Sequence, residues 1–134
     1  MMHASYLQEL QSDWFPHVTD SGLERIIELL DKGSPLLIHG AFTRALPMGC
    51  LATHIAWHHP ATCQWTVEAG IMWLSRVAKL NPATSLVVRA WDNSGQHDWQ
   101  LRNELLDAFR IERDRRQAEH DERIPDDVGE LAFA

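Results

Sequence analysis

Hydrophobic residues recur along most of the chain with the spacing of α-helices. They stand three and four positions apart at Leu23, Ile26, Ile27 and Leu30, and again at Leu101, Leu105, Ala108 and Phe109. Such spacing places them on one helix face. Residues 63–80 are apolar on nearly every side, which predicts a helix buried on more than one side. No regular alternation of strands and helices is present. The pattern therefore predicts an all-α fold, a single compact domain of five to six helices with orthogonal or bundle-like packing.

Capping residues mark several helix ends. Ser21 and Glu24 fit a capping box, in which each side chain satisfies a backbone N–H of the first turn. Gly33 supplies the left-handed residue that ends many helices. Ser34 is followed by a proline, which predicts a second helix start, and Asp98 predicts the start of the last helix.

The stretch from residue 46 to residue 60 concentrates the chemistry of the chain. On a helical wheel one continuous arc holds Trp57, Cys50, His54, His58, Leu51, Ile55 and Met48. The histidines therefore lie inside the apolar face. A helix near 46–59, beside the apolar helix near 63–80, is predicted to form the centre of the domain.

This arc suggests a metal site. Cys50, His54 and His58 are spaced four apart, so each neighbouring pair can reach one ion of zinc or another transition metal. Eight helical residues rise about 12 Å, too far for all three to share an ion. A site would need two of them and further ligands from His39, Cys63, Glu68 or His97. The alternative, which the sequence favours, is a half-buried face whose imidazoles bond to backbone carbonyls. No cofactor is then expected.

Cys50 is also a candidate nucleophile. It follows a glycine near a predicted helix start, where the helix dipole lowers the pKa of a thiol, and His54 one turn later could act as its base. No Asn or Asp can be assigned to orient that histidine. The sequence therefore favours a protein that is not an enzyme.

Six tryptophans are a heavy load for 134 residues. Most are expected in the core, where each indole N–H needs a partner, and the pair Trp14 and Phe15 is expected to pack against the domain. The alternative is an aromatic-lined pocket or partner-binding patch.

The charge of the chain narrows the possible partners. The formal net charge is −7 and no basic run is free of acidic residues, which argues against nucleic-acid or anionic-membrane binding.

Two cysteines without a Cys-x-x-Cys motif predict neither a disulfide framework nor a zinc ribbon. No secretory signal pattern or long apolar run is present, so a cytoplasmic protein is expected. Residues 1–120 are predicted to form the domain, and residues 121–134 a disordered or loosely docked tail.

Three short motifs resemble a pattern found in small uncharacterised bacterial and phage helical proteins. Residues 40–44 resemble its Gly-x-x-x-Arg segment, residues 49–52 its Cys-Leu-Gly helix start, and residues 91–95, loosely, its Asn-Asp-x-x-Gly turn. The chain departs from the pattern with Ala52 in place of glycine and with Asp92 before Asn93. The resemblance implies a helical fold and a mobile-element or accessory setting, and it implies no activity.

The first and third motifs contain the residues of a further site prediction. Asp92, Asn93 and Gly95 are predicted to form a turn, in which Asp92 could pair with Arg44. For function, we expect a small non-enzymatic interaction or accessory module that binds a protein partner or self-associates. The alternative is a metal-binding protein or metal-dependent hydrolase that uses the face of Cys50, His54 and His58.

Overall fold

The computed structural model describes residues 2–133, with side chains described for residues 6–122. The α-helices are α1 (Met2–Glu9), α2 (Asp20–Lys32), α3 (Leu51–Trp57), α4 (Ala69–Met72), α5 (Leu86–Ser94) and α6 (Trp99–Phe133). π-helical turns follow α1 (Leu10–Trp14) and α4 (Trp73–Val77), and 3-10 turns cover Phe15–His17 and Gly95–His97. The described residues contain no strand, only isolated bridges from Gly49 to Leu37 and Thr43. The all-α prediction is confirmed.

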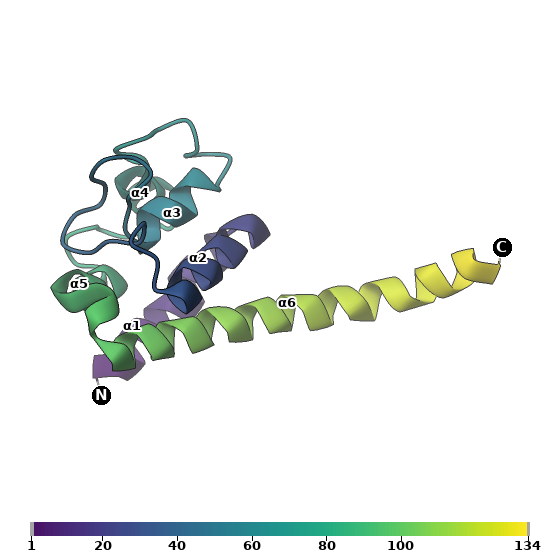
Figure 1. The fold of residues 1–134 in the computed structure, drawn as a ribbon. Coiled ribbons are helices and arrows are strands. Elements are labelled where there is room, and N and C mark those ends of the chain that lie inside the picture. Colours follow the sequence, from purple (N-terminus) through teal and green to yellow (C-terminus); the bar gives the residue numbers. More distant parts are fainter. Residues whose placement is uncertain (1, 134) are drawn as a thin grey trace.

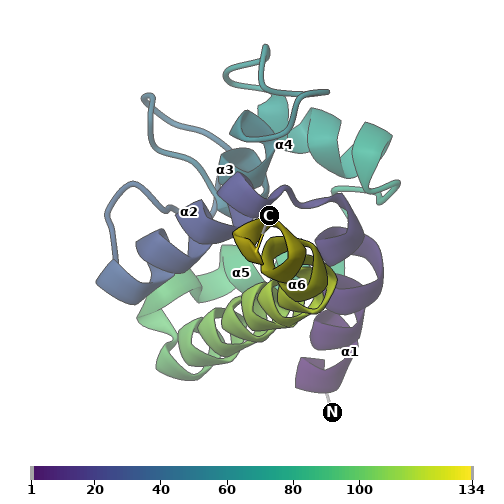
Figure 2. The same cartoon turned by 90° about the vertical axis from the view of Figure 1, so that its right-hand side faces the viewer.

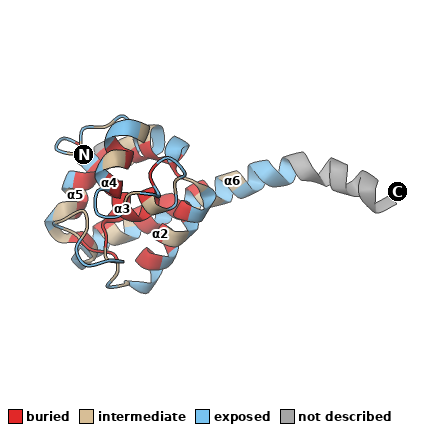
Figure 3. Ribbon diagram, turned by 90° about the horizontal axis from the view of Figure 1, so that it is seen from above, coloured by how far each residue is buried: buried red, intermediate tan, exposed pale blue. Residues whose placement is uncertain are grey.

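The long helix α6 is the axis of the molecule. Figure 1 shows the other helices gathered around its N-terminal half, and Figure 2, seen along its axis, places α1 and α2 on either side of it. α3 packs between α2 and α4 on the far side from α6. Figure 3 shows that the buried residues gather in this body, whereas α6 is exposed from residue 117 to residue 122. Among the described helices, none has the length and hydrophobicity needed to cross a membrane.

Large aromatic side chains fill the core. The rings of Trp14 and Trp73 meet edge to face at 5.2 Å, and those of Phe15 and Phe109 at 5.3 Å. All four are buried, so the predicted packing of Trp14 and Phe15 against the domain is confirmed. The indole N–H of Trp73 donates to the carbonyl of His17, as expected for a buried tryptophan.

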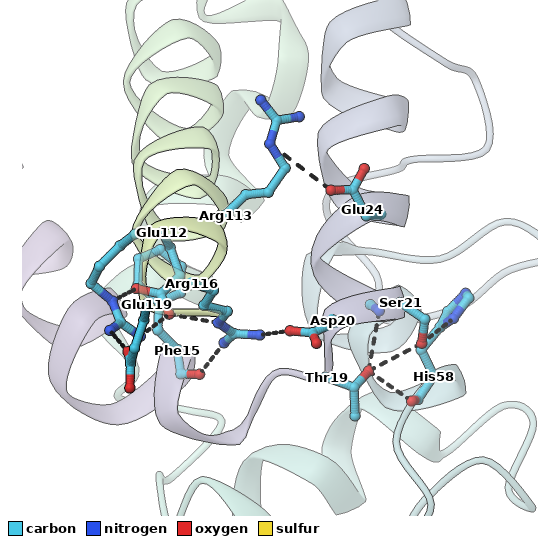
Figure 4. A network of polar contacts seen from close by, with 12 residues as sticks. Phe15, Thr19, Asp20, Ser21, Glu24, His58, Glu112, Arg113, Arg116 and Glu119 are labelled. Atoms are coloured by element: carbon cyan, nitrogen blue, oxygen red, sulfur yellow. Dashed lines mark hydrogen bonds and ion pairs between the residues drawn. The ribbon is translucent and has the colours of Figure 1, made fainter. Parts of the chain in front are cut away.

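Arg116 ties α6 to the N-terminal elements, as Figure 4 shows. Its guanidinium donates to the carboxylate of Asp20 at 2.8 Å, to the carbonyl of Phe15 at 2.8 Å and to Glu112 at 2.7 Å. One side chain of α6 therefore joins this helix to the stretch from Phe15 to Asp20, about a hundred positions earlier in sequence. Glu112 and Arg116, four positions apart in the same helix, form an ion pair.

The capping predictions were partly right. Gly33 ends α2 with φ 60°, and the carboxylate of Asp98 accepts from the N–H of Leu101 at 3.1 Å. The cap of α2 is Thr19, whose hydroxyl accepts from the N–H of Gly22, so the predicted cap at Ser21 was two residues late.

Residues 34–50 depart most from the predicted pattern. The helix start at Ser34 is wrong, because its hydroxyl accepts from the N–H of Leu36 within a turn and no helix follows. The central helix begins only at Leu51, after non-helical bonds such as that from the N–H of Cys50 to the carbonyl of Phe42. Similarly, the predicted helix near 63–80 is helical only from Ala69.

The C-terminal end of α5 replaces the predicted turn. Asp92 and Asn93 lie in the helix, and Gly95 follows it with φ 54°. The predicted tail at residues 121–134 falls mostly on residues whose side chains lie outside the description. That prediction therefore stays a prediction.

Candidate functional site

The backbone of residues 34–38 is held in place by side chains from other elements. Gln96 Nε2 donates to the carbonyls of Ser34 at 2.9 Å and Leu37 at 3.2 Å. The indole of Trp91 in α5 donates to the carbonyl of Ile38 at 2.7 Å. In α3, His54 Nε2 lies 2.8 Å from the carbonyl of Leu36. These side-chain contacts satisfy backbone carbonyls, which are acceptors, and they hold the segment in place although it belongs to no helix or strand.

A pocket of about 590 Å³ lies between this segment and the start of α6. We call it the arginine pocket. It is lined by Gly33, Pro35, Leu37, Ile38, His39, Arg44, Gln96, His97, Trp99 and Arg102. None of these residues is acidic, although the chain carries a net charge of −7. The pocket wall is therefore a positively charged region on an acidic protein.

Its two arginines have no carboxylate partner among the described residues. Arg102 donates to the backbone carbonyl of Asp31 at 2.9 Å, while the carboxylate of Asp31 pairs with Arg110 at 2.8 Å. Arg44 is exposed and forms no ion pair with a described residue, Asp92 included, so the predicted pairing of Arg44 with Asp92 is not observed. Arg102 also donates to Oδ1 of Asn103 at 3.5 Å, so its partners are neutral acceptors and neither guanidinium charge is balanced by a described carboxylate.

Trp99 gives the pocket an aromatic rim. It is 72 % exposed, whereas Trp14, Trp73 and Trp91 are fully buried. The guanidinium of Arg102, one turn along α6, lies 5.7 Å from the ring centre. A large exposed indole beside two unpaired cations is what an aromatic-lined binding site would present.

Two histidines complete the wall. The rings of His39 and His97 meet edge to face with centres 5.5 Å apart. Gly95 makes this approach possible, because a Cβ there would lie 2.5 Å from Nδ1 of His39 and its φ of 54° suits glycine. The predicted turn residue Gly95 thus has a packing role beside the pocket.

Gln96 contributes an unused acceptor. Its Nε2 serves two carbonyls, which fixes the orientation of the amide. Its Oε1 is then buried without a hydrogen-bond partner among the described residues. A buried acceptor without a partner costs about 1–3 kcal/mol, and such groups often mark functional sites.

The predicted metal residues are not brought together. Cys50 and His54 are buried at α3, His58 is exposed with Nδ1 3.3 Å from the hydroxyl of Ser21, and His39 lies in the arginine pocket. No group of three or more His, Cys, Asp or Glu among the described side chains is placed to hold a metal. The contact of His54 with the carbonyl of Leu36 is the packed-face arrangement that the sequence favoured.

Cys50 does not have the setting of a nucleophile. It caps α3 from a buried position, with its sulfur 3.5 Å from the hydroxyl of Thr53. Burial raises the pKa of the Cys50 thiol, whereas the exposed helix start considered from sequence would lower it. The thiolate is therefore disfavoured.

His54 makes the stability depend on pH. Burial lowers the pKa of His54, although the contact with the carbonyl of Leu36 opposes this shift. The unfolded chain, with a histidine pKa of about 6.5, then binds the proton more readily, so stability is fully present above that pH and falls as pH decreases. We expect His54→Gln, which does not titrate, to show a smaller loss of unfolding free energy between pH 7.5 and pH 5.5 in urea titrations. The exposed His120→Gln is the control, and equal losses in wild type and His54→Gln would contradict the assignment.

Sequence reasoning named His39, His97 and Arg44 for other reasons and missed Gln96 and Arg102. Comparison with known protein families, with curated proteins and with solved structures finds no match for this chain.

Proposed function

We propose that this chain is a non-enzymatic binding module whose arginine pocket holds an anionic group of its ligand. The observation that carries the proposal is the pair Arg44 and Arg102, two cations without carboxylate partners at one pocket. Arg25, Arg110 and Arg116 each pair with an Asp or Glu. Arg76 and Arg89 have no ion pair with a described residue either, but neither lines this pocket, where Arg44 and Arg102 lie together.

The chemistry of the wall favours an anion. Arginine presents a planar set of N–H donors that matches a carboxylate or phosphate with two parallel hydrogen bonds. Arg44 comes from the loop before α3 and Arg102 from the first turn of α6, so an anion between them would be held from two elements. The net charge of −7 repels anions from the rest of the surface, which makes this pocket the favoured place for one.

Binding without catalysis agrees with the lining. The pocket offers no Ser, Thr, Cys, Asp or Glu side chain that could act as a nucleophile. Cys50, the candidate from sequence, is buried elsewhere in the fold.

The proposal is tested by titrating inorganic phosphate into the protein and following the indole N–H signal of Trp99 by NMR. We expect a saturable shift that is lost in the double variant Arg44→Gln with Arg102→Gln. Arg89→Gln, which removes an exposed arginine of α5 outside the pocket, is the matched control and should keep the shift. The proposal fails if phosphate produces no saturable shift, or if the double variant responds like wild type.

A further inference from the structure

From the same pocket we infer that the ligand is a mononucleotide, with its phosphate at the two arginines and its base on Trp99. The inference rests on the proposed function and adds the class of ligand. It follows from two properties of the wall taken together: a pair of arginines that favours an anion, and an exposed tryptophan that favours a planar ring.

The exposed side chain of Trp99 favours a ligand that contains a planar ring. A side chain of this size that is 72 % exposed leaves most of its surface to water. Every nucleobase offers a flat π face, and stacking on an exposed aromatic side chain is the usual way proteins hold single bases. Arg102 links the two functions, because its guanidinium lies 5.7 Å from the Trp99 ring and on the wall of the arginine pocket. A phosphate at Arg102 is therefore within one nucleotide of a base at Trp99.

Gln96 shapes the wall without offering a free polar atom to the ligand. Its Nε2 is used on the carbonyls of Ser34 and Leu37, and its Oε1 is buried. The imidazoles of His39 and His97 add polar contacts on the same wall.

Size and charge separate a mononucleotide from the other anions. The volume of about 590 Å³ exceeds what a bare phosphate needs and lies within the range of small-molecule sites, about 300–1,000 Å³. A polynucleotide is disfavoured, because a net charge of −7 would repel its remaining phosphates. An acidic peptide gives the arginines a carboxylate and gives Trp99 no planar base.

The test compares AMP with its two halves, adenosine and ribose 5-phosphate, by calorimetric titration of the full chain. We expect AMP to bind more tightly than either half by at least about tenfold, which corresponds to about 1.4 kcal/mol. Trp99→Ala should reduce the affinity for AMP to that for ribose 5-phosphate, and Trp99→Phe, which keeps a ring, should retain most of it. The double variant Arg44→Gln with Arg102→Gln should reduce AMP to the level of adenosine, and Arg89→Gln should leave it unchanged.

These outcomes distinguish the two proposals. If ribose 5-phosphate binds through the arginines and AMP binds no more tightly, the mononucleotide is wrong while the anion pocket stands. A phosphate or carboxylate of a protein is then the remaining source of the anion. If no anion binds, both proposals fail. Trp99 and Arg44 are exposed, so their variants are expected to fold, and far-UV circular dichroism checks this.

Discussion

Replacing Glu9 by alanine is expected to lower the free energy of unfolding by about 3 kcal/mol, because one carboxylate serves four donors. It accepts from the hydroxyl of Ser85 at 2.6 Å and from the backbone N–H groups of Leu86 at 2.8 Å and Val87 at 3.1 Å. It also accepts from the indole N–H of Trp14 at 3.0 Å. Glu9, which is 76 positions from Ser85 in sequence, thus caps the N-terminal end of α5.

The size of this loss follows from what would be left behind. The first N–H groups of a helix have no partner within the helix, and a negative charge near them is favoured by the helix dipole. Without Glu9, the buried side chains of Trp14 and Ser85 lose an acceptor as well. Glu28→Ala is the control, since Glu28 only pairs with Arg25 and Lys32 on the surface, and its loss should cost far less than that of Glu9. Urea denaturation measures both, and similar losses would contradict the capping role.

Arg116→Met is expected to cost about 2–4 kcal/mol, because it removes three hydrogen bonds, two of which join α6 to other elements. Asp20, the carbonyl of Phe15 and Glu112 all lose their shared donor. Glu112 is only 8 % exposed and would keep Arg115 as its remaining partner. A methionine fills the space of the stem without its charge, so the loss reports on the polar contacts.

Arg115→Met is the matched control for this prediction. Arg115 also pairs with Glu112, yet its side chain is 57 % exposed, so its loss should cost well below that of Arg116. Burial disfavours the ionised form of Glu112, but its bonds to both arginines hold the pKa of the carboxyl below its ordinary value. The contribution of Glu112 is therefore present above a pH of about 4.3 and lost as pH falls through the folded pKa. Equal losses for the two arginine variants would show that the contact with α2 adds nothing.

The sequence predicted those parts of the fold that neighbouring residues determine. The stop at Gly33, the cap at Asp98 and the apolar stripe of α6 depend on residues within one or two turns, and all three are observed. The same local signals failed for residues 34–50. There the turn at Ser34 and the carbonyl partners Gln96 and Trp91 replace helical bonds, and the partners lie more than fifty positions away in sequence.

The sequence did not predict the arginine pocket for the same reason, because its residues are distant from one another along the chain. His39 and Arg44 stand before the central stretch and Gln96, Trp99 and Arg102 near the start of α6, so no local spacing connects them. The cysteine and histidines of the central stretch suggested a metal site because they are close in sequence. In the structure, Cys50 and His54 are instead buried in the core. One local signal was present, since Trp99 stands directly after the cap Asp98 and outside the apolar stripe of Leu101, Leu105 and Phe109.

The way residues 34–38 are held has a consequence for how this protein can change over generations. The contacts that fix their path reach the backbone carbonyls, which every amino acid possesses. Mutations at Pro35 or at the neighbouring His39 can therefore alter the lining of the pocket while Gln96, Trp91 and His54 preserve its shape. Descendants of this chain could exchange one ligand for another through a few substitutions in a single short segment, at little cost to folding.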